Sequence, residues 1–144
     1  MRLILDTNIF LEVILDQEKA DEAKEILANS NKHECFISDY SLHSIGLLLF
    51  RKKMYDVFRE FVKDMITNAG IMIAAIYSDE TESVINAAQR FNLDFDDAYQ
   101  YAVSEKYDLT IISFDSDFDK TARGRKTPIE INQPVVDSYL HNSI

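Results

Sequence analysis

The sequence predicts an α/β fold in which a central parallel sheet of about five strands is flanked by helices. Short apolar runs alternate with longer segments whose apolar residues recur at helical spacing. The strand-like runs are apolar throughout, as expected for a parallel sheet covered on both faces. Glycine and proline number only 3 and 2, which favours short loops. We expect a single domain over residues 1–144, with residues from about 133 to 144 forming a C-terminal tail of little pattern.

The predicted strands and helices follow one another along the chain. Each strand is a short apolar run, and each helix carries apolar residues at i, i+3 and i+4 spacing. Polar residues that suit helix caps precede several of the helices. The strands are expected at residues 3–5, 33–38, 71–76 and 109–113, with a short fifth strand near 129–131. The helices are expected at residues 9–15, 19–29, 42–50, 54–66, 79–91 and 94–103.

Composition narrows the classes of function. Three scattered glycines, Gly46, Gly70 and Gly124, cannot build a glycine-rich phosphate loop, which argues against a Walker-type or dinucleotide site. The single cysteine, Cys35, excludes an internal disulfide and is expected to be a buried strand residue. No apolar run is long enough for a signal peptide or a membrane span, so we expect a cytoplasmic protein without a membrane role.

The net charge of −10 counts against simple binding to a phosphate backbone. The objection weakens if several carboxylates converge on a cation, because the cation then inverts the local charge. Basic residues are also concentrated just after the last acidic cluster. This basic loop, consisting of Lys120, Arg123, Arg125 and Lys126, is either a solvated loop or a contact for a polyanionic substrate.

Several aspartates are placed to meet at one edge of the predicted sheet. Asp6 and Asp115 each follow a predicted strand, and Asp97 begins the helix that leads into the strand before Asp115. The carboxyl ends of parallel strands share one edge, which is the usual ligand crevice. Oxygen-only ligands suit Mg²⁺ or Mn²⁺ better than zinc. A site of this kind performs phosphoryl chemistry, because the metal can activate water and stabilise the leaving oxygen.

Each aspartate taken alone also has a structural explanation. Asp6 can be a helix cap and nothing more. Asp94 and Asp97 can be the N-cap and the third-position carboxylate of a later helix. Asp115 and Asp117 can be turn formers that bind their own backbone. The shared position at the sheet edge is what favours a metal site over these separate roles.

The same residues resemble a known family, the PIN domain, many of whose small prokaryotic members are VapC-type toxins. The resemblance is carried by Leu5-Asp6-Thr7-Asn8, by Asp96-Asp97-Ala98 and by the run of residues 112–118, ISFDSDF. It implies a PIN fold and an Mg²⁺- or Mn²⁺-dependent ribonuclease activity. By motif, Asp6, Asp97 and Asp115 match the metal-binding acids of the family, and Asp117 matches an acid often found beside them. Asn8 and Ser113 match small polar positions that support the site.

The sequence departs from the family pattern at one position. PIN nucleases usually carry a glutamate on the helix after the second strand, in a pattern like Ser-x-x-x-Leu-x-Glu. Here Ser38 and Leu42 match the pattern, but Ser44 stands where the glutamate is expected. Serine brings no charge to a cation, so metal affinity is expected to fall. Asp39, Asp94 and Asp117 are candidates to compensate.

Three hypotheses follow. The first is a divalent-metal-dependent endoribonuclease that hydrolyses RNA phosphodiester bonds, as the toxin of a toxin–antitoxin pair with a small antitoxin partner and as a homodimer. The second is a PIN-fold module that binds RNA or protein without cleaving, motivated by Ser44. The third, a phosphatase or receiver domain, fits poorly because Asn8 occupies the second acidic position that such phosphatases need. For the first, the residues expected to contact or support the substrate are Asn8, Ser113, Lys120, Arg123, Arg125 and Lys126.

Overall fold

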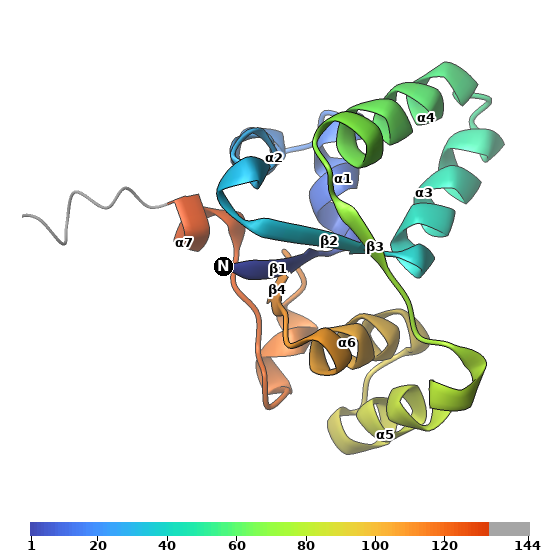
Figure 1. Ribbon diagram of the computed structural model, residues 1–144, viewed down its shortest axis with the longest axis vertical. Helices are drawn as coiled ribbons and strands as arrows, with labels where there is room; N and C mark the ends of the chain where they lie inside the picture. Colours follow the sequence, from blue (N-terminus) through green and yellow to red (C-terminus); the bar gives the residue numbers. More distant parts are fainter. Residues whose placement is uncertain (133–144) are drawn as a thin grey trace, which may run out of the picture.

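A computed structural model describes residues 1–132 and places a four-stranded parallel sheet at the centre of the molecule (Figure 1). The strand order is β3-β2-β1-β4. Leu3 of β1 pairs with Cys35 of β2 on one side and with Thr110 of β4 on the other. The first strand therefore lies inside the sheet, as its apolar sequence predicts. The strands are β1 (Arg2–Leu5), β2 (Glu34–Ser38), β3 (Met72–Ala74) and β4 (Thr110–Ile112).

Within residues 1–132, seven α-helices pack around this sheet. In Figure 1, α1 to α4 lie above the sheet, and α5 and α6 lie below it. A π-helical segment, Val62–Asn68, continues α4. The helices are α1 (Thr7–Ile14), α2 (Ala20–Ala28), α3 (Asp39–Arg51), α4 (Tyr55–Phe61), α5 (Thr81–Phe91), α6 (Phe95–Tyr107) and α7 (Pro128–Asn132).

Successive strand residues are buried in two different cores, which explains why the strands are apolar throughout. Leu3 and Leu5 pack in the core under α1 to α4, whereas Ile4 between them packs in the core with α5 and α6. The same alternation places Ile112 in the first core and Ile111 in the second. A strand with side chains buried on both faces has no solvent-facing position for a polar residue.

Three helices begin at the carboxyl edge of the sheet, each with a polar cap that the sequence supplies. Asp6 caps α1 by accepting a hydrogen bond from the Thr7 backbone N–H. Ser38 caps α3 in the same way through Ser41, and Asp94 caps α6 through Asp97. Because caps satisfy backbone N–H groups that the helix leaves free, they fix where each helix starts. The residues next to the caps are thereby held at this edge.

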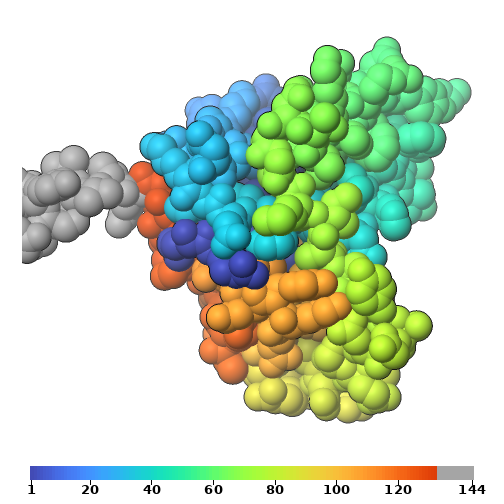
Figure 2. Space-filling view, viewed as in Figure 1, coloured from blue at the N-terminus to red at the C-terminus, as the bar shows by residue number. Residues whose placement is uncertain are grey.

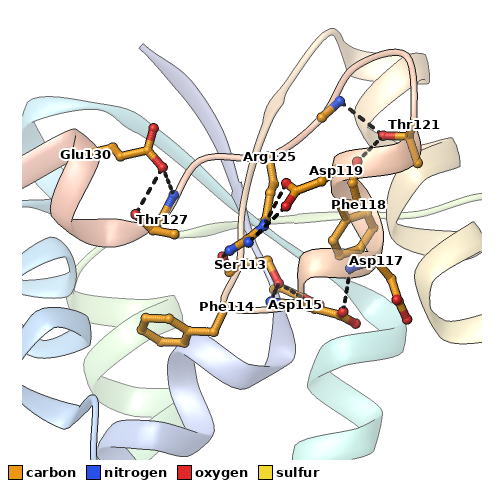
Figure 3. Close-up of polar contacts among 12 residues, drawn as sticks. Ser113, Phe114, Asp115, Asp117, Phe118, Asp119, Thr121, Arg125, Thr127 and Glu130 are labelled. Carbon is orange, nitrogen blue, oxygen red and sulfur yellow. Dashed lines mark hydrogen bonds and ion pairs between the residues drawn. The ribbon is translucent and has the colours of Figure 1, made fainter.

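The short fifth strand predicted near residues 129–131 is wrong. Residues Pro128–Asn132 form α7 instead, with proline at the first helical position. Glu130 accepts hydrogen bonds from the backbone N–H and the hydroxyl of Thr127, which closes the first turn (Figure 3). The chain touches the sheet edge earlier, through an isolated bridge between Lys126 and Ile112. The predicted C-terminal tail, residues 133–144, lies outside the described residues.

The first strand and α6 lie side by side on one face of the molecule. Figure 2 shows the blue residues of β1 against the orange residues of α6. The Arg2 guanidinium donates a hydrogen bond to the Tyr107 carbonyl oxygen, 3.0 Å away. Within residues 1–132, none of the helices is both long enough and apolar enough to cross a bilayer.

Candidate metal centre

Asp6 lies at the end of β1 and is buried, with 7 % of its surface exposed. Its Oδ1 accepts hydrogen bonds from the Thr7 backbone N–H (2.9 Å) and from Gln100 Nε2 (2.8 Å). Its Oδ2 accepts one from the Ser113 hydroxyl (2.7 Å). Burial raises the pKa of Asp6, while the hydrogen bonds from Gln100 and Ser113 work in the opposite direction because they favour the carboxylate. The side chain is therefore held in one orientation by donors from three parts of the chain.

Asp97 lies in the first turn of α6 and is equally buried. Burial raises the pKa of Asp97 to about 8, and the nearby charge of Asp115 and a hydrogen bond with it act in the same direction. Like charges this close disfavour ionisation of Asp97, so its neutral form is favoured in the absence of a cation. Bringing the pair together has an electrostatic cost that a divalent cation would offset.

Asp115 and Asp117 follow β4 and complete a cluster with Asp97. One carboxylate oxygen from each of the three aspartates lies within 4.8 Å of the others. Asp115 also caps the short turn that contains Asp117, accepting a hydrogen bond from its backbone N–H at 2.8 Å. Figure 3 shows the two carboxylates projecting to the same side of this turn. The capping role proposed for the aspartates in isolation is thus real, but it coexists with their convergence.

The carboxylates line a pocket of about 240 Å³ at the carboxyl edge of the sheet. Asp6, Asp97 and Asp115 all face it, which confirms the predicted meeting of the two ends of the chain. Ser44 also lines it, whereas its correspondence to the family's glutamate stays a prediction. Within residues 1–132, no lysine or arginine forms an ion pair with these three aspartates.

The candidates to compensate for Ser44 differ in position. Asp39 accepts a hydrogen bond from the Tyr99 hydroxyl at 2.6 Å and does not line the pocket. Asp94 caps α6, where its charge helps to raise the pKa of Asp97. Asp117 joins the cluster. Of the three, Asp117 alone contributes an oxygen to the group of converging carboxylates.

Sequence reasoning missed Gln100, which lines the pocket one turn of α6 after Asp97. Its side-chain amide donates to Asp6 Oδ1 and to the Ser41 hydroxyl, both at 2.8 Å. Gln100 is only 2 % exposed, and its Oε1 has no hydrogen-bond partner among the described residues. Its i+3 spacing from Asp97 was a signal that both share a helix face. Nothing in the sequence, however, shows that this face meets Asp6.

The residues of the pocket fit a divalent cation of the Mg²⁺ or Mn²⁺ type. They offer converging carboxylate oxygens, a carboxyl group with a raised pKa and a buried amide oxygen without a partner. These are hard oxygen donors, and no histidine or cysteine lines the pocket. The expected family pattern would add one further charge at Ser44. The site is therefore suited to a cation but holds less negative charge than that pattern prescribes.

Asn8 and Ser113 act as supports that join the ends of two strands. Asn8 Nδ2 donates to the Ser113 hydroxyl at 3.1 Å, and Asn8 Oδ1 accepts from the Phe114 backbone N–H. The Ser113 hydroxyl in turn donates to Asp6 and accepts from the Asp115 backbone N–H. Both residues thus position the acids. Their contact with a substrate stays a prediction.

The basic loop is bound largely to the protein itself. Arg125 donates to both oxygens of Asp119 and to the Ser113 carbonyl oxygen (Figure 3). Arg123 donates to Asp108, and the Lys120 ammonium group donates to the Asn92 carbonyl oxygen. Lys126 is exposed. The contact of these four residues with RNA stays a prediction, but three of them already have acceptors within the described chain.

The fold and the pocket together define a class of protein: a parallel α/β domain with aspartates clustered at the carboxyl edge of its sheet. Residues 3–124 match the PIN domain family. The chain belongs to this family. The match includes Asp6, Asp97, Asp115 and Asp117 and ends within the basic loop. No curated protein matches the sequence.

Solved structures with a similar fold support the same classification. A toxin–antitoxin complex from Klebsiella pneumoniae aligns at a TM-score of 0.69 and 21% identity, covering 88% of this chain and 97% of that chain. The Mycobacterium tuberculosis toxin VapC20, described as cleaving the sarcin-ricin loop, aligns at 0.69 and 19% identity, covering 84% and 95%. VapBC2 from Rickettsia felis, bound to a DNA fragment from its promoter, aligns at 0.66 and 13%, covering 88% and 97%. At these identities the likeness concerns the fold.

Proposed function

We propose that this protein is a divalent-metal-dependent endoribonuclease that hydrolyses RNA phosphodiester bonds. The observation that carries the proposal is the convergence of carboxylate oxygens from Asp97, Asp115 and Asp117 beside a pocket that Asp6, Asp97 and Asp115 line. Membership of the PIN domain family and the similarity to VapC20, a toxin that cleaves the sarcin-ricin loop, support the same activity. Mg²⁺ or Mn²⁺ is the proposed cofactor.

The chain's own residues supply the geometry for this reaction. A divalent cation in the pocket would activate water and stabilise the charge that develops on the phosphate oxygens. Asp97, Asp115 and Asp117 would hold it, and Asp6 would complete the ligand set. Asn8, Ser113 and Gln100 keep Asp6 in one orientation through hydrogen bonds of 3.4, 2.7 and 2.8 Å. Because a preorganised site needs little reorganisation during the reaction, these neutral donors contribute to the rate by holding Asp6 in place.

We also propose that the protein is the toxin of a toxin–antitoxin pair. A similar fold occurs in a toxin–antitoxin complex from Klebsiella pneumoniae and in FitAcB from Neisseria gonorrhoeae. A small antitoxin would cover the acidic pocket. The homodimer expected from the family resemblance remains part of this proposal. Size-exclusion chromatography with light scattering, with and without the product of a neighbouring small gene, would test both interactions.

The direct test is cleavage of mixed structured RNAs in Mg²⁺, in Mn²⁺ and in EDTA, with Asp6→Asn purified in parallel. Asparagine keeps the oxygen that caps α1 but removes the charge, so the fold should persist while cleavage falls to background. Circular dichroism of the variant checks the fold. Cleavage that survives in Asp6→Asn or in EDTA would contradict the proposal.

A second function, a PIN-fold module that binds RNA or protein without cleaving, is favoured by one observation. Ser44 lines the pocket at the position of the family's glutamate, so one charge is missing from the site. This alternative predicts weak or absent Mn²⁺ binding in isothermal titration calorimetry. Tight Mn²⁺ binding together with metal-dependent cleavage would rule it out.

A further inference from the structure

Three aromatic rings form a cluster at the mouth of the acidic pocket. Tyr40, Phe95 and Tyr99, here called the aromatic ledge, have ring centroids 5.8 to 5.9 Å from one another. Tyr40 comes from the first turn of α3, and the other two come from the first turns of α6. Tyr40 lines the acidic pocket itself, and so does Asp96, the residue next to Phe95. The ledge is therefore continuous with the candidate metal centre.

Hydrogen bonds fix the two tyrosines of the ledge. The Tyr40 hydroxyl donates to Asp96 at 2.6 Å. The Tyr99 hydroxyl donates to Asp39 at 2.6 Å and accepts from the Ile76 backbone N–H at 2.9 Å. Tyr99 is buried, whereas Phe95 is 60 % exposed. The two fixed tyrosines therefore support the Phe95 ring, which is exposed to solvent. This ring is large and apolar and has no atom that can form a hydrogen bond with water.

The charges around the ledge disfavour a phosphate group at this place. Asp94, Asp96 and Asp97 lie beside Phe95 in the sequence, and the basic loop has three of its four cations engaged within the protein. A nucleic acid on this surface must therefore gain affinity from contacts that do not depend on charge. Base–aromatic stacking is such a contact, because every nucleobase has a π-face.

We propose that the aromatic ledge binds a nucleobase of single-stranded RNA by stacking on Phe95, next to the phosphodiester that enters the acidic pocket. The proposal rests on the proposed function for its choice of ligand. Duplex RNA does not expose base faces, so an unpaired segment such as a loop or an end is required. Phe95 is then a binding residue that selects unpaired over paired nucleotides, and it has no part in holding the cation.

The experiment measures binding of a single-stranded RNA that carries 2-aminopurine, whose fluorescence is quenched on stacking. It uses the full chain with Asp115→Asn and Mg²⁺, so that the RNA stays intact. Adding Phe95→Ala should weaken binding about tenfold and abolish the quenching, whereas Phe95→Tyr should retain both. Tyr77→Ala is the matched control: Tyr77 is 62 % exposed but packs against Lys106 at the other end of α6, roughly 16 Å from Phe95 along the helix.

Two results would overturn the aromatic ledge as a base-binding site. One is that Phe95→Ala and Tyr77→Ala bind the single-stranded RNA with equal affinity. The other is that the protein binds no single-stranded RNA at all, which would favour a protein partner for the aromatic ledge. Mn²⁺ calorimetry and cleavage by the otherwise unmodified chain separate this failure from failure of the proposed function. If the protein cleaves RNA and neither binding nor cleavage depends on Phe95, only the base-binding role of the aromatic ledge is rejected. If RNA binding depends on Phe95 but the protein neither binds Mn²⁺ nor cleaves RNA, the nuclease proposal is rejected and the base-binding role is supported.

Discussion

The acidic pocket and the basic loop are neighbours in the sequence, yet the fold treats their charges in opposite ways. Asp115 and Asp117 face other carboxylates, and within residues 1–132 they form no ion pair with lysine or arginine. Arg125, a few residues later, is bound to Asp119 and to the Ser113 carbonyl oxygen, and its side chain is only 15 % exposed. The charges of the acidic pocket are not balanced by ion pairs within these residues, whereas the charge of Arg125 in the basic loop is balanced by Asp119.

This difference indicates which of the two regions gains more free energy when a ligand of opposite charge binds. Carboxylates that repel one another gain free energy when a cation arrives, because the cation removes the repulsion. An arginine that already has two acceptors gains little from a phosphate, because it must first give up those hydrogen bonds. The acidic pocket is thus prepared for a ligand, while the basic loop chiefly holds its own shape. The four predictions below test this contrast.

The largest effect is expected for Asp115→Asn, which removes one converging charge. Mn²⁺ affinity should fall by on the order of a hundredfold, because a lost ligand costs at least as much as a lost supporting contact. Asp119→Asn is the matched control from the same loop, and it should leave Mn²⁺ affinity nearly unchanged because Asp119 faces Arg125. Isothermal titration calorimetry measures both. Equal losses in the two variants would show that the loop responds as a unit.

The next effect concerns the proton held by Asp97. Its pKa is raised from 3.8 to about 8 in the folded protein, so the folded state binds a proton that the unfolded state has already lost between these values. The metal-free protein should therefore lose stability as the pH rises through this window, most of it by about pH 8. Mn²⁺ binding displaces the proton, so its affinity should rise by up to about tenfold per pH unit below that pH.

Thermal unfolding with and without Mn²⁺ across this pH range checks both parts of the prediction. Asp97→Asn cannot titrate and should lose the pH dependence of stability that belongs to this group. The assignment of the proton to Asp97 would be contradicted if the melting temperature of the metal-free protein rose with pH through this window. It would also be contradicted if Asp97→Asn kept the same decrease of melting temperature with pH as the unmodified protein.

A gain of about tenfold in Mn²⁺ affinity is expected for Ser44→Glu, since the new carboxylate enters the acidic pocket. His43→Glu adds the same charge to the neighbouring position of α3, where the side chain lines an apolar groove away from the acids. It should change Mn²⁺ affinity little. If both variants gain equally, the increase reflects overall charge and the position of Ser44 has no special role.

The smallest effect on ligand binding is expected for Arg125→Met. RNA affinity should change by less than about twofold, because the guanidinium is already occupied. Stability should fall by about 1–3 kcal/mol, since the Ser113 carbonyl oxygen loses its charged donor. Urea unfolding and RNA titration give the two values. A large loss of RNA affinity with unchanged stability would instead support the predicted contact of the basic loop with the RNA backbone.

Much of the fold could be predicted because the relevant signals are local. The apolar strands, the helix caps at Asp6, Ser38 and Asp94 and the order of elements all follow from short stretches of sequence. The fifth strand failed because Ile129 and Ile131 alternate as in a strand, while Pro128 and the Thr127–Glu130 contact start a helix. A five-residue segment carries too little periodicity to separate these possibilities.

The sequence by itself determined that Asp6 and Asp115 reach the carboxyl edge of the sheet, because a residue that follows a buried parallel strand emerges there. Only the tertiary structure decided what those acids meet. The order β3-β2-β1-β4 places β1 beside β4, so Asp6 reaches Ser113, and the packing of α6 brings Gln100 to Asp6. The tertiary structure also decided the hydrogen bonds of Arg125 and the solvent exposure of Phe95, because both depend on neighbours that are distant in the chain.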